Sequence, residues 1–454
     1  MKRIFSFFLI MISYLVLSSC SKDWLDQKPD GSMSTPSTLT DFEALLDENR
    51  TYLSPLGIGE IASDDHFTSE TIWAAGITNQ ERNAYTWSKD YPNIEIADWN
   101  SSYSGVLKCN VVIDGIEKVI LRNASDAIRK NSILGNALFH RARLYFELSQ
   151  IYAPLYVSSQ RNSLDMGVPL RLDPDISVSS SRAINSEVYD QIIKDLETAT
   201  KLLPEYGEYK IRASKVSAFA LLAIINLSIG EYEKASIYCD SVFNAKFRLI
   251  NFNDVVAGIK NLGRFNDEVI LHTTGARYPL LSIGCNIDTF LYSTYKKGDL
   301  RKSVYFDSTI TRIIYKGAYS NSRNIPFYGI ALDEVYLVKS EALCRLNKTK
   351  NAVEVLNSLL VQRFELNKYI PYDLNLSSTE LLPIILLERR KELILRGRRW
   401  LDLKRFNNDP AIAKTLLRNI GGSQYLLQPK SFKYVFPIPD DVISKSGIKQ
   451  NNGW

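Results

Sequence analysis

The chain has 454 residues, of which 45% are hydrophobic and 23% charged, and its formal net charge is +5. These fractions are typical of a globular protein that is long enough to bury a large core. Because basic and acidic residues nearly balance, the composition argues against a nucleic-acid-binding protein, which usually has a dominant basic face.

The N-terminus has the pattern of a bacterial lipoprotein signal. A basic start precedes an almost wholly apolar stretch, residues 4–17, which is too short to cross ~30 Å of hydrocarbon as a helix but suits the core of a signal peptide. The motif "LSSC" that follows resembles a lipobox, whose cysteine is lipidated and becomes the first mature residue. We therefore expect residues 1–19 to be a signal peptide, and Cys20 to anchor the mature chain to a membrane through acyl chains.

Long helical patterns follow. Apolar residues recur at three- and four-residue steps in "NSILGNALFHRARLYFELSQIYAPLY" and "SEVYDQIIKDLETATKLLP", and the two patterns stop at Pro154 and Pro204. Two more stretches, "KVSAFALLAIINLSIGEYEKASIYCDSVF" and "EVYLVKSEALCRLNKTKNAVEVLNSLLVQR", each predict two helices, joined at Gly230 and at Asn347. Their alanines lie at the offsets of tetratricopeptide (TPR) repeats, which predicts TPR-like hairpins. About a hundred residues separate the two copies, so a regular solenoid is not expected.

Two regions, at about residues 52–100 and 247–330, lack sustained helical periodicity. They contain short β-like pieces such as "DEVILHTT" and "TRIIYKG", with glycine, asparagine and aromatic residues between them. Long irregular stretches inside a compact domain are usually functional loops or accessory substructure. We therefore predict a mainly α fold, in which a TPR-like helical hairpin scaffold carries a loop-rich, partly β accessory face. No linker divides the interior, so a single domain over residues 20–454 is favoured over two interleaved lobes.

Cysteines and histidines give no sign of a metal or redox centre. Cys109, Cys239, Cys285 and Cys344 are far apart and show no CxxC spacing, so we interpret them as small buried thiols in preference to disulfides. The three histidines are widely spaced, which leaves zinc sites and histidine-based catalysis without support. We expect no metal and no cofactor.

The basic segment "ERRKELILRGRRWLDLKRF" has two interpretations. Its arginines could gather as an anion site for a phosphate or an acidic sugar, or they could belong to a structural helix end. Glu392 and Arg396 form an i,i+4 pair of favourable orientation, Gly397 is a plausible helix cap, and apolar residues give the segment a buried face. These features favour the structural interpretation.

Paired carboxylates raise the possibility of a glycosidase. Asp64-Asp65, Asp440-Asp441 and Glu388 are candidates, but a hydrolase needs two carboxyls at a set separation in opposed environments, and no pair stands out. Asp440 follows a proline, which favours the start of a short helix. Because no nucleophile elbow, Walker loop or dinucleotide fingerprint is apparent, we expect a protein that is not an enzyme.

Aromatic residues of the two irregular regions are the candidate binding residues. Flat rings can cover the C–H faces of a pyranose, while amides and carboxylates bond its hydroxyl edges. A single ring is more often part of a core, but clustering in loops favours a binding surface. The candidates are Trp73, Asn79, Trp87 and Tyr91 in the first region and Tyr278, Asn286, Asp288, Tyr292, Tyr295, Arg323 and Tyr328 in the second. Trp99 is interpreted as structural.

Jointly, these motifs resemble the SusD/RagB family, outer-membrane lipoproteins of Bacteroidetes that bind nutrients, mostly glycans. The similar segments are "CSKDWLDQKP", "WNSSYSGVLKCNVVIDGI", "HRARLYFELSQIYAPLY", the basic segment and the end "YVFPIPDDVISKSGIKQNNGW". The end departs from the family pattern at Ser446-Gly447, where Asn-Pro is usual, at Asn452, where Pro is usual, and at Trp454, where Tyr is usual.

The resemblance implies a non-catalytic protein that captures an oligosaccharide and passes it to a SusC-like TonB-dependent transporter. It implies an outer-membrane location through the lipid on Cys20, with Lys22-Asp23 resembling a cell-surface export signal. It also suggests that Trp24-Leu25-Asp26 packs on the scaffold. Two alternatives remain open: a TPR-type membrane lipoprotein that binds a peptide or protein and no sugar, and, less favoured, a glycoside hydrolase.

Overall fold

The computed structural model describes residues 36–48, 53–90, 97–282, 284–309 and 312–454. Cys20, the segment 22–26 and Tyr91 lie outside these residues, so what the sequence predicts for them stays a prediction. Within the described residues, no helix combines the length and the hydropathy needed to cross a membrane.

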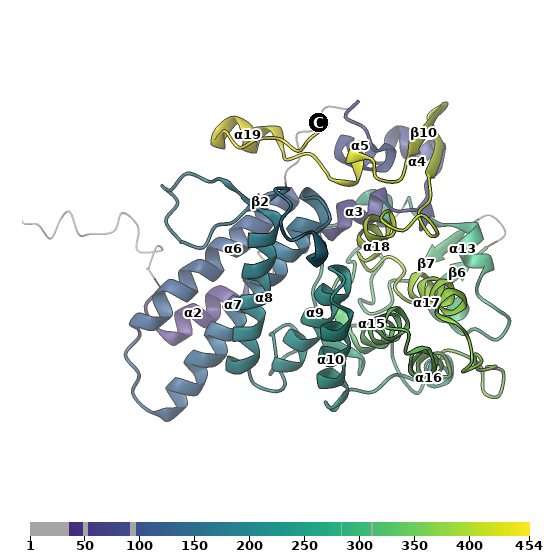
Figure 1. Cartoon of the computed structure of the whole chain (residues 1–454), viewed down its shortest axis with the longest axis horizontal. Helices are drawn as coiled ribbons and strands as arrows, with labels where there is room; N and C mark the ends of the chain where they lie inside the picture. The colour runs from purple at the N-terminus through teal and green to yellow at the C-terminus, as the bar shows by residue number, and fades with distance from the viewer. Residues whose placement is uncertain (1–35, 49–52, 91–96, 283, 310–311) are drawn as a thin grey trace, which may run out of the picture.

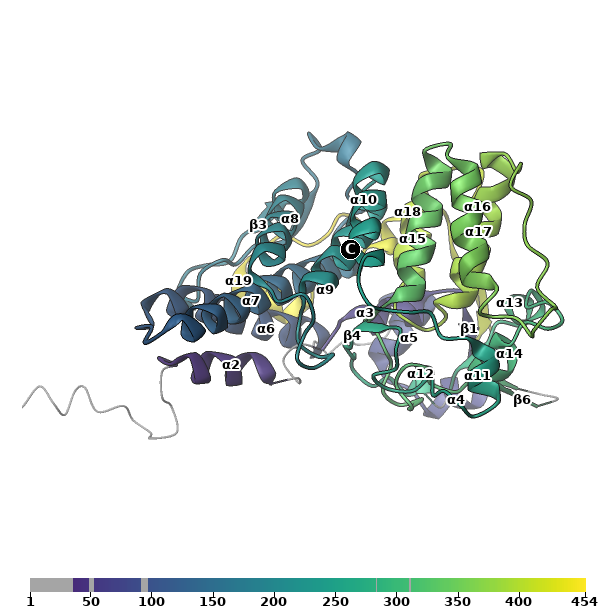
Figure 2. The same cartoon turned by 90° about the horizontal axis from the view of Figure 1, so that it is seen from below.

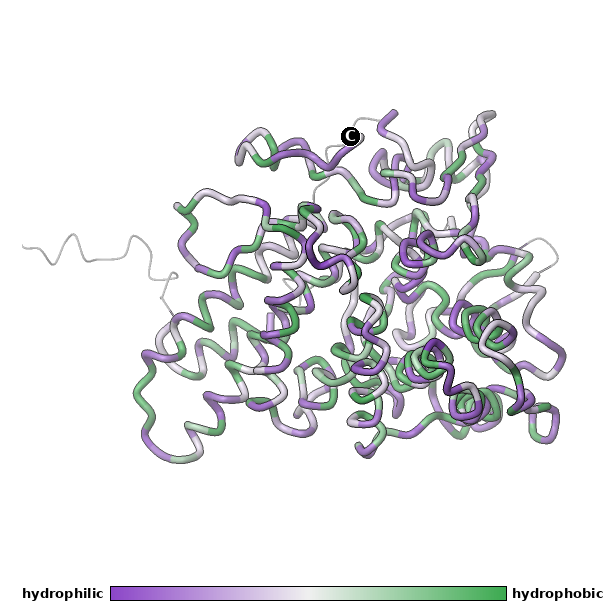
Figure 3. Tube along the Cα trace, viewed as in Figure 1, coloured by the Kyte–Doolittle hydropathy of each residue, from purple (hydrophilic) through white to green (hydrophobic). Residues whose placement is uncertain are grey.

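A row of helices packed side by side forms the body of the molecule (Figures 1 and 2). Each helix contacts the next in the order α6, α7, α8, α9, α10 and α15, and both α16 and α17 pack on α15. Figure 3 shows hydrophobic residues along all of them. The bounds are α6 Ala97–Gly115, α7 Ala124–Tyr152, α8 Asn185–Leu202, α9 Lys215–Ser228, α10 Tyr232–Phe243, α15 Leu332–Arg345, α16 Thr349–Leu360 and α17 Ser378–Glu392. One shorter helix, α2 (Leu39–Asp47), packs on α6 and α7.

The structure confirms the two predicted helical hairpins, α9–α10 and α15–α16. Gly230 and Asn347 sit in the turns with φ angles of 87° and 59°, the left-handed conformation that ends a helix and that glycine and asparagine adopt most easily. Ala235 and Ala352 are fully buried, as expected of packing positions. The helices predicted to stop at Pro154 and Pro204 end at Tyr152 and Leu202.

The accessory face consists of short elements on one side of this row (Figure 2). They are α3 Leu56–Ala62, β1 His66–Phe67, α4 Glu70–Ala75, α5 Asn79–Thr86, α11 Phe252–Val256, β4 Val269–Leu271, α12 Pro279–Ser282, β5 Asn286–Ile287, α13 Thr289–Ser293, α14 Arg301–Tyr305, β6 Phe306–Ser308, β7 Ile313–Tyr315 and β8 Ile330–Ala331. The first irregular region is thus built mainly of short helices. Each is shorter than the window over which helical periodicity becomes visible.

The two irregular regions join into one accessory face. Strand β1 of the first region pairs antiparallel with β5 of the second, placing His66 opposite Ile287 and Phe67 opposite Asn286. The backbone N–H of Ser54 also donates to the carbonyl of Thr274 at 2.9 Å. These pairings connect segments about two hundred residues apart, and no local pattern in the sequence indicates them.

The C-terminal part returns to the N-terminal part of the chain (Figure 1). The remaining elements are η3 Ile116–Lys118, η4 Ser158–Gln160, β2 Met166–Pro169, β3 Arg182–Ile184, α18 Arg399–Phe406, β9 Leu416–Ile420, β10 Ser423–Leu427, η5 Phe432–Tyr434 and α19 Asp440–Ser446. We call residues 433–454 the terminal strap. Its Phe436 N–H donates to the carbonyl of Ile151 at 2.9 Å, next to the end of α7.

The basic segment is structural, as its sequence favoured. Each of its arginines pairs with a carboxylate: Arg389 with Asp402, Arg390 with Asp65, Arg396 with Asp333, Arg398 with Glu334, Arg399 with Asp64 and Arg405 with Glu341, at 2.5–2.9 Å. Asp64 and Asp65 therefore neutralise buried arginines, and Glu388 binds Lys391 and Arg301. Asp440 begins α19, as predicted.

All four predicted thiols, Cys109, Cys239, Cys285 and Cys344, are buried and free. Within the described ranges, no three His, Cys, Asp or Glu side chains gather in a way that could hold a metal ion.

Candidate ligand-binding site

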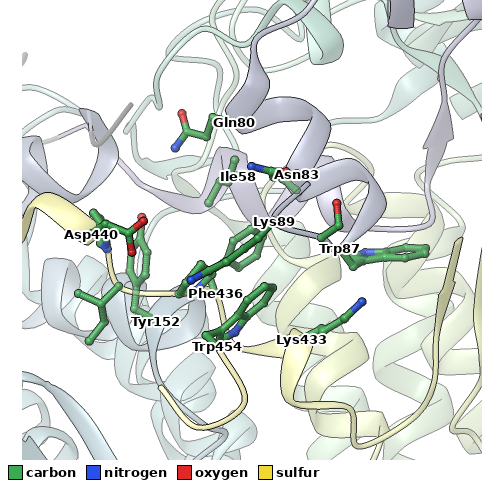
Figure 4. Close-up of a pocket in the computed structure, with 15 residues that line it drawn as sticks. Ile58, Gln80, Asn83, Trp87, Lys89, Tyr152, Lys433, Phe436, Asp440 and Trp454 are labelled. Atoms are coloured by element: carbon green, nitrogen blue, oxygen red, sulfur yellow. The ribbon is translucent and has the colours of Figure 1, made fainter. Parts of the chain in front are cut away.

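A pocket of about 190 Å³ opens where α3, α5 and the end of α7 meet the terminal strap (Figure 4). Its walls combine rings, charges and amides: Trp87, Tyr152, Phe436 and Trp454; Lys89, Lys433 and Asp440; Gln80 and Asn83. Such a mixture, mainly apolar with a few polar groups, is typical of sites for small molecules. In Figure 4, Lys89, Phe436 and Trp454 occupy the middle, with Asp440 and Tyr152 at the left and Trp87 and Lys433 at the right.

Helix α5 supplies one wall, and both of its ends are tightly specified. At its start, the Thr78 hydroxyl accepts from the N–H of Glu81, and the Glu81 carboxylate accepts from the N–H of Thr78 at 2.7 Å. The second oxygen of that carboxylate accepts from the N–H of Leu280, which ties α5 to the second irregular region. At its end, Trp87 takes the left-handed conformation with φ 55°, which turns the chain so that Lys89 lines the pocket.

The terminal strap supplies the opposite wall and is held by side-chain amides. Asn451 Nδ2 donates to the carbonyls of Tyr152 and Phe436 at 2.9 and 2.7 Å, so one amide joins the end of α7 to the strap. The indole N–H of Trp454 donates to the Val435 carbonyl at 2.7 Å. These bonds fix the final ring of the chain beside the pocket.

The described residues of the pocket carry charge but include no pair of carboxylates. The Lys89 ammonium lies 5.3 Å from the centre of the Trp454 ring, within the range of a cation–π contact. Burial, reinforced by the charge of Asp98, raises the pKa of Tyr152, so its hydroxyl stays neutral. Among the lining residues that the structure describes, Asp440 is the one carboxylate, whereas glycoside hydrolysis needs two. This chemistry suits binding.

A second hollow, of about 280 Å³, lies beside α6 between β2 and α19. Its polar groups already have partners, because the Asn110 amide donates to the Arg171 carbonyl and accepts from Arg141, and the Tyr103 hydroxyl donates to the Pro169 carbonyl. The Trp99 ring is 5% exposed, as its structural interpretation requires. We therefore favour the pocket between α5 and the terminal strap.

Of the predicted residues in the first region, Trp87 lines this pocket. Its indole N–H donates to the Ala62 carbonyl at 3.0 Å, and the ring is 3% exposed. Trp73 lies in the core, where its ring is 5.9 Å from that of Tyr85. The Asn79 side chain accepts from Arg82 at the start of α5 and does not line the pocket.

The predicted residues of the second region lie elsewhere, and most have internal roles. The Tyr278, Tyr295 and Tyr328 rings are at most 6% exposed and pack in the core, so they offer no open face for stacking. With Arg323, which pairs with Asp307, Tyr278 and Tyr328 border a hollow of about 30 Å³. That volume accommodates a water molecule or two but no sugar ring. The structure therefore does not support a sugar platform at these three rings.

The other three predicted residues of this region are also engaged. Asn286 pairs across β1–β5 and accepts from Arg312, and Asp288 caps α13 by accepting from the N–H of Leu291 at 2.7 Å. Tyr292 is half-buried, with its ring edge-to-face on Phe306 at 5.5 Å. None of these three side chains lines the pocket of Figure 4.

Sequence reasoning missed most side chains of the pocket, among them Asn83, Lys89, Tyr152, Lys433, Phe436 and Trp454. Tyr152 and the strap residues belong to segments whose patterns indicate the fold, so their aromatic content was attributed to packing. The available signal was the concentration of rings near the C-terminus, in "FKYVFPIP" and the final tryptophan.

Comparisons with known proteins agree with this architecture. A family model described as "Starch-binding associating with outer membrane" matches residues 23–227, and a model of the SusD family matches residues 313–454. The SusD-like protein P2 of Formosa agariphila is 23% identical, covering 80% of this chain and 83% of that protein.

Solved structures share the fold. A putative sugar-binding protein from Bacteroides vulgatus superposes with a TM-score of 0.76 at 21% identity, over 93% of this chain and all of the other. Surface glycan-binding protein A from Bacteroides fluxus superposes with a TM-score of 0.71 at 16% identity, over 92% of this chain and all of the other. The mainly α, TPR-like fold expected from the sequence is thereby confirmed. With family matches in both its N-terminal and C-terminal parts, the chain belongs to the SusD/RagB family.

Proposed function

We propose that this protein is a non-catalytic glycan-binding lipoprotein, which captures an oligosaccharide in the pocket between α5 and the terminal strap. The observation that carries the proposal is the composition of that pocket. The rings of Phe436 and Trp454 can cover the C–H face of a sugar, and the side chains of Gln80, Asn83 and Asp440 offer donors and acceptors for its hydroxyls. The names of the two structural relatives above, both sugar- or glycan-binding, support it.

The location and the partner belong to the same proposal. The lipid on Cys20 would hold the protein in the outer membrane, and Lys22-Asp23 would direct it to the cell surface. There it would deliver its ligand to a SusC-like TonB-dependent transporter. Support comes from the lipobox-like motif and from the family description, which refers to association with the outer membrane.

The test is calorimetry of the purified mature protein against a panel of oligosaccharides and peptides. We expect at least one oligosaccharide to bind, and Trp454→Ala to weaken it about tenfold, because aromatic contacts of this kind contribute on the order of 1 kcal/mol. Phe290→Ala is the matched control: this ring is 69% exposed on α13 and lines no part of the pocket, so its loss should leave binding unchanged.

Three outcomes would contradict the proposal in different ways. Binding that survives Trp454→Ala but is lost in Tyr292→Ala would move the site to the second irregular region. A protein that binds peptides and no oligosaccharide would be the TPR-type alternative. Release of shortened products from a bound glycan would establish a hydrolase.

A further inference from the structure

Two lysines reach the pocket from different walls. Lys89 follows the end of α5, and Lys433 lies at the start of the terminal strap; in Figure 4 they flank Trp454. Neither ammonium has a carboxylate oxygen within 4.0 Å among the residues that the structure describes. The pocket's own carboxylate, Asp440, lies at the opposite end from Lys433 in that view. The two positive charges therefore lie on opposite sides of the Trp454 ring, and no counter-charge for either is found among the described residues.

This arrangement contrasts with the other basic groups packed around these elements. In the basic segment, each arginine is matched by a carboxylate. Lys89 is exposed and Lys433 is half-buried, and both line a concave site whose ligand would displace part of the water around them. A charged group that loses water without gaining a partner costs free energy.

We infer that the ligand of this pocket is an acidic oligosaccharide, whose carboxylate or sulfate groups lie beside Lys89 and beside Lys433, on the two sides of Trp454, while a sugar ring stacks on Trp454. The inference rests on the proposed glycan-binding function and specifies its substrate class. The Lys89 ammonium lies 5.3 Å from the centre of the Trp454 ring. It therefore places positive charge beside the indole surface on which the sugar ring would stack.

Charge then selects among sugars of the same shape. Acidic substituents give these ammonium groups counter-charges, whereas a neutral sugar covers them and supplies no counter-charge, so the pocket disfavours it. Lysine acts as a point charge and does not demand the bidentate geometry of arginine, so a carboxylate and a sulfate are both acceptable.

The experiment compares matched pairs of probes by calorimetry. Hexagalacturonate against its methyl-esterified form tests a carboxylate, and a κ-carrageenan hexasaccharide against its desulfated form tests a sulfate. We expect an acidic member to bind at least about tenfold more tightly than its neutral partner, and its affinity to fall between about 50 and about 500 mM NaCl, because salt screens partly exposed charges.

Variants assign the preference to the two lysines. The double variant Lys89→Gln, Lys433→Gln should bring the ratio of acidic to neutral affinity close to one, while Trp454→Ala should weaken both members of a pair. Lys350→Gln is the control, since this exposed lysine on α16 lines no part of the pocket and should leave the ratio unchanged. Circular dichroism verifies that each variant is folded.

The possible failures are distinguishable. If neutral oligosaccharides bind as well as acidic ones, or better, the inference is overturned and the glycan-binding proposal stands. The inference is likewise overturned if the acidic preference persists in the double lysine variant. If no oligosaccharide of any kind binds, the inference and the proposed function fall together.

Discussion

Arg301 shows how single residues hold the two halves of this molecule together. Its guanidinium is fully buried and lies 2.7 Å from a carboxylate oxygen of Asp299, 2.6 Å from Glu388 and 3.0 Å from Glu392. Glu392 also accepts from Arg363 at 2.7 Å. Because Glu388 and Glu392 are on α17 and Arg301 is on α14, this cluster fastens the accessory face to the scaffold.

We predict that Arg301→Met lowers the free energy of unfolding by about 3–5 kcal/mol, because the three buried carboxylates are then left with only Lys391 and Arg363 as counter-charges and carry an excess of buried negative charge. Urea denaturation measures the change. The control is Arg161→Met, which removes an ion pair with Asp190 whose side chains are 59% and 46% exposed. That pair should contribute under about 1 kcal/mol. Similar losses of unfolding free energy in the two variants would show that the buried cluster stabilises the fold no more than an exposed ion pair does.

At the scale of elements, α18 is joined to the end of α7 by one lysine. The Lys404 Nζ donates to the carbonyls of Gln150 and Ala153 at 2.7 and 2.8 Å. The first is one of the terminal carbonyls that a helix leaves without partners, and the second belongs to the residue that follows α7. Tyr152, which lines the pocket, lies between these two residues. Burial lowers the pKa of Lys404 from 10.5 to about 7.

This pKa shift predicts a pH dependence of stability. Between about pH 7 and the ordinary lysine pKa of 10.5, the unfolded chain holds a proton on Lys404 that the folded protein does not, so the free energy of unfolding rises with pH. The rise from this group is at most about 1.4 kcal/mol per pH unit. Lys404→Met should remove it, so the difference between wild type and variant in urea denaturation should grow from pH 7 to about pH 9.

The reference for this measurement is Lys350→Met on exposed α16, whose stability should follow that of the wild type at every pH. Lys404→Met also loses two hydrogen bonds, which lowers its stability throughout the range. A constant gap between wild type and Lys404→Met would mean that Lys404 stays charged in the fold.

One large hydrophobic core unites segments from both ends of the described chain. The pocket depends on this core, because its walls come from segments that are distant in the sequence. The largest hydrophobic cluster includes residues from Leu39 to Ile448, so N-terminal and C-terminal segments pack together. The pocket draws Ile58 from α3, Tyr152 from α7 and Trp454 from the strap. The single domain over residues 20–454 stays a prediction.

Membrane attachment is the prediction that concerns the protein as a whole. In a bacterial host that processes lipoproteins, the wild type should partition into the detergent phase of Triton X-114, and Cys20→Ala should remain in the aqueous phase, because acyl chains supply the attachment. Cys109→Ala, at a buried thiol, is the control and should partition like the wild type. Detergent partitioning of Cys20→Ala would refute the lipid anchor.

The sequence predicts well those features of the structure that depend on residues close together in the chain. The helical periodicity of α7 and α8, and the turns at Gly230 and Asn347, arise from residues close in the chain, so a linear pattern reveals them. The structural role of the basic segment was also predictable, because its apolar residues follow helical spacing. The expected details are wrong, however: α17 ends at Glu392, before Gly397. Glu392 pairs with Arg301 and Arg363, while Arg396 pairs with Asp333. Family motifs spread along the chain then identified the fold.

The tertiary structure alone decided where a ligand can bind. An exposed ring and a buried ring look alike in sequence: Tyr295 and Tyr328 lie in the core, while Trp454 lines the pocket. Their exposure depends on contacts between distant segments, such as the β1–β5 pairing and the Asn451 bonds that place the strap against α7. Whether a side chain is buried depends on how the whole chain packs. The site can therefore be recognised only after segments from the N-terminal and C-terminal parts of the chain have packed together.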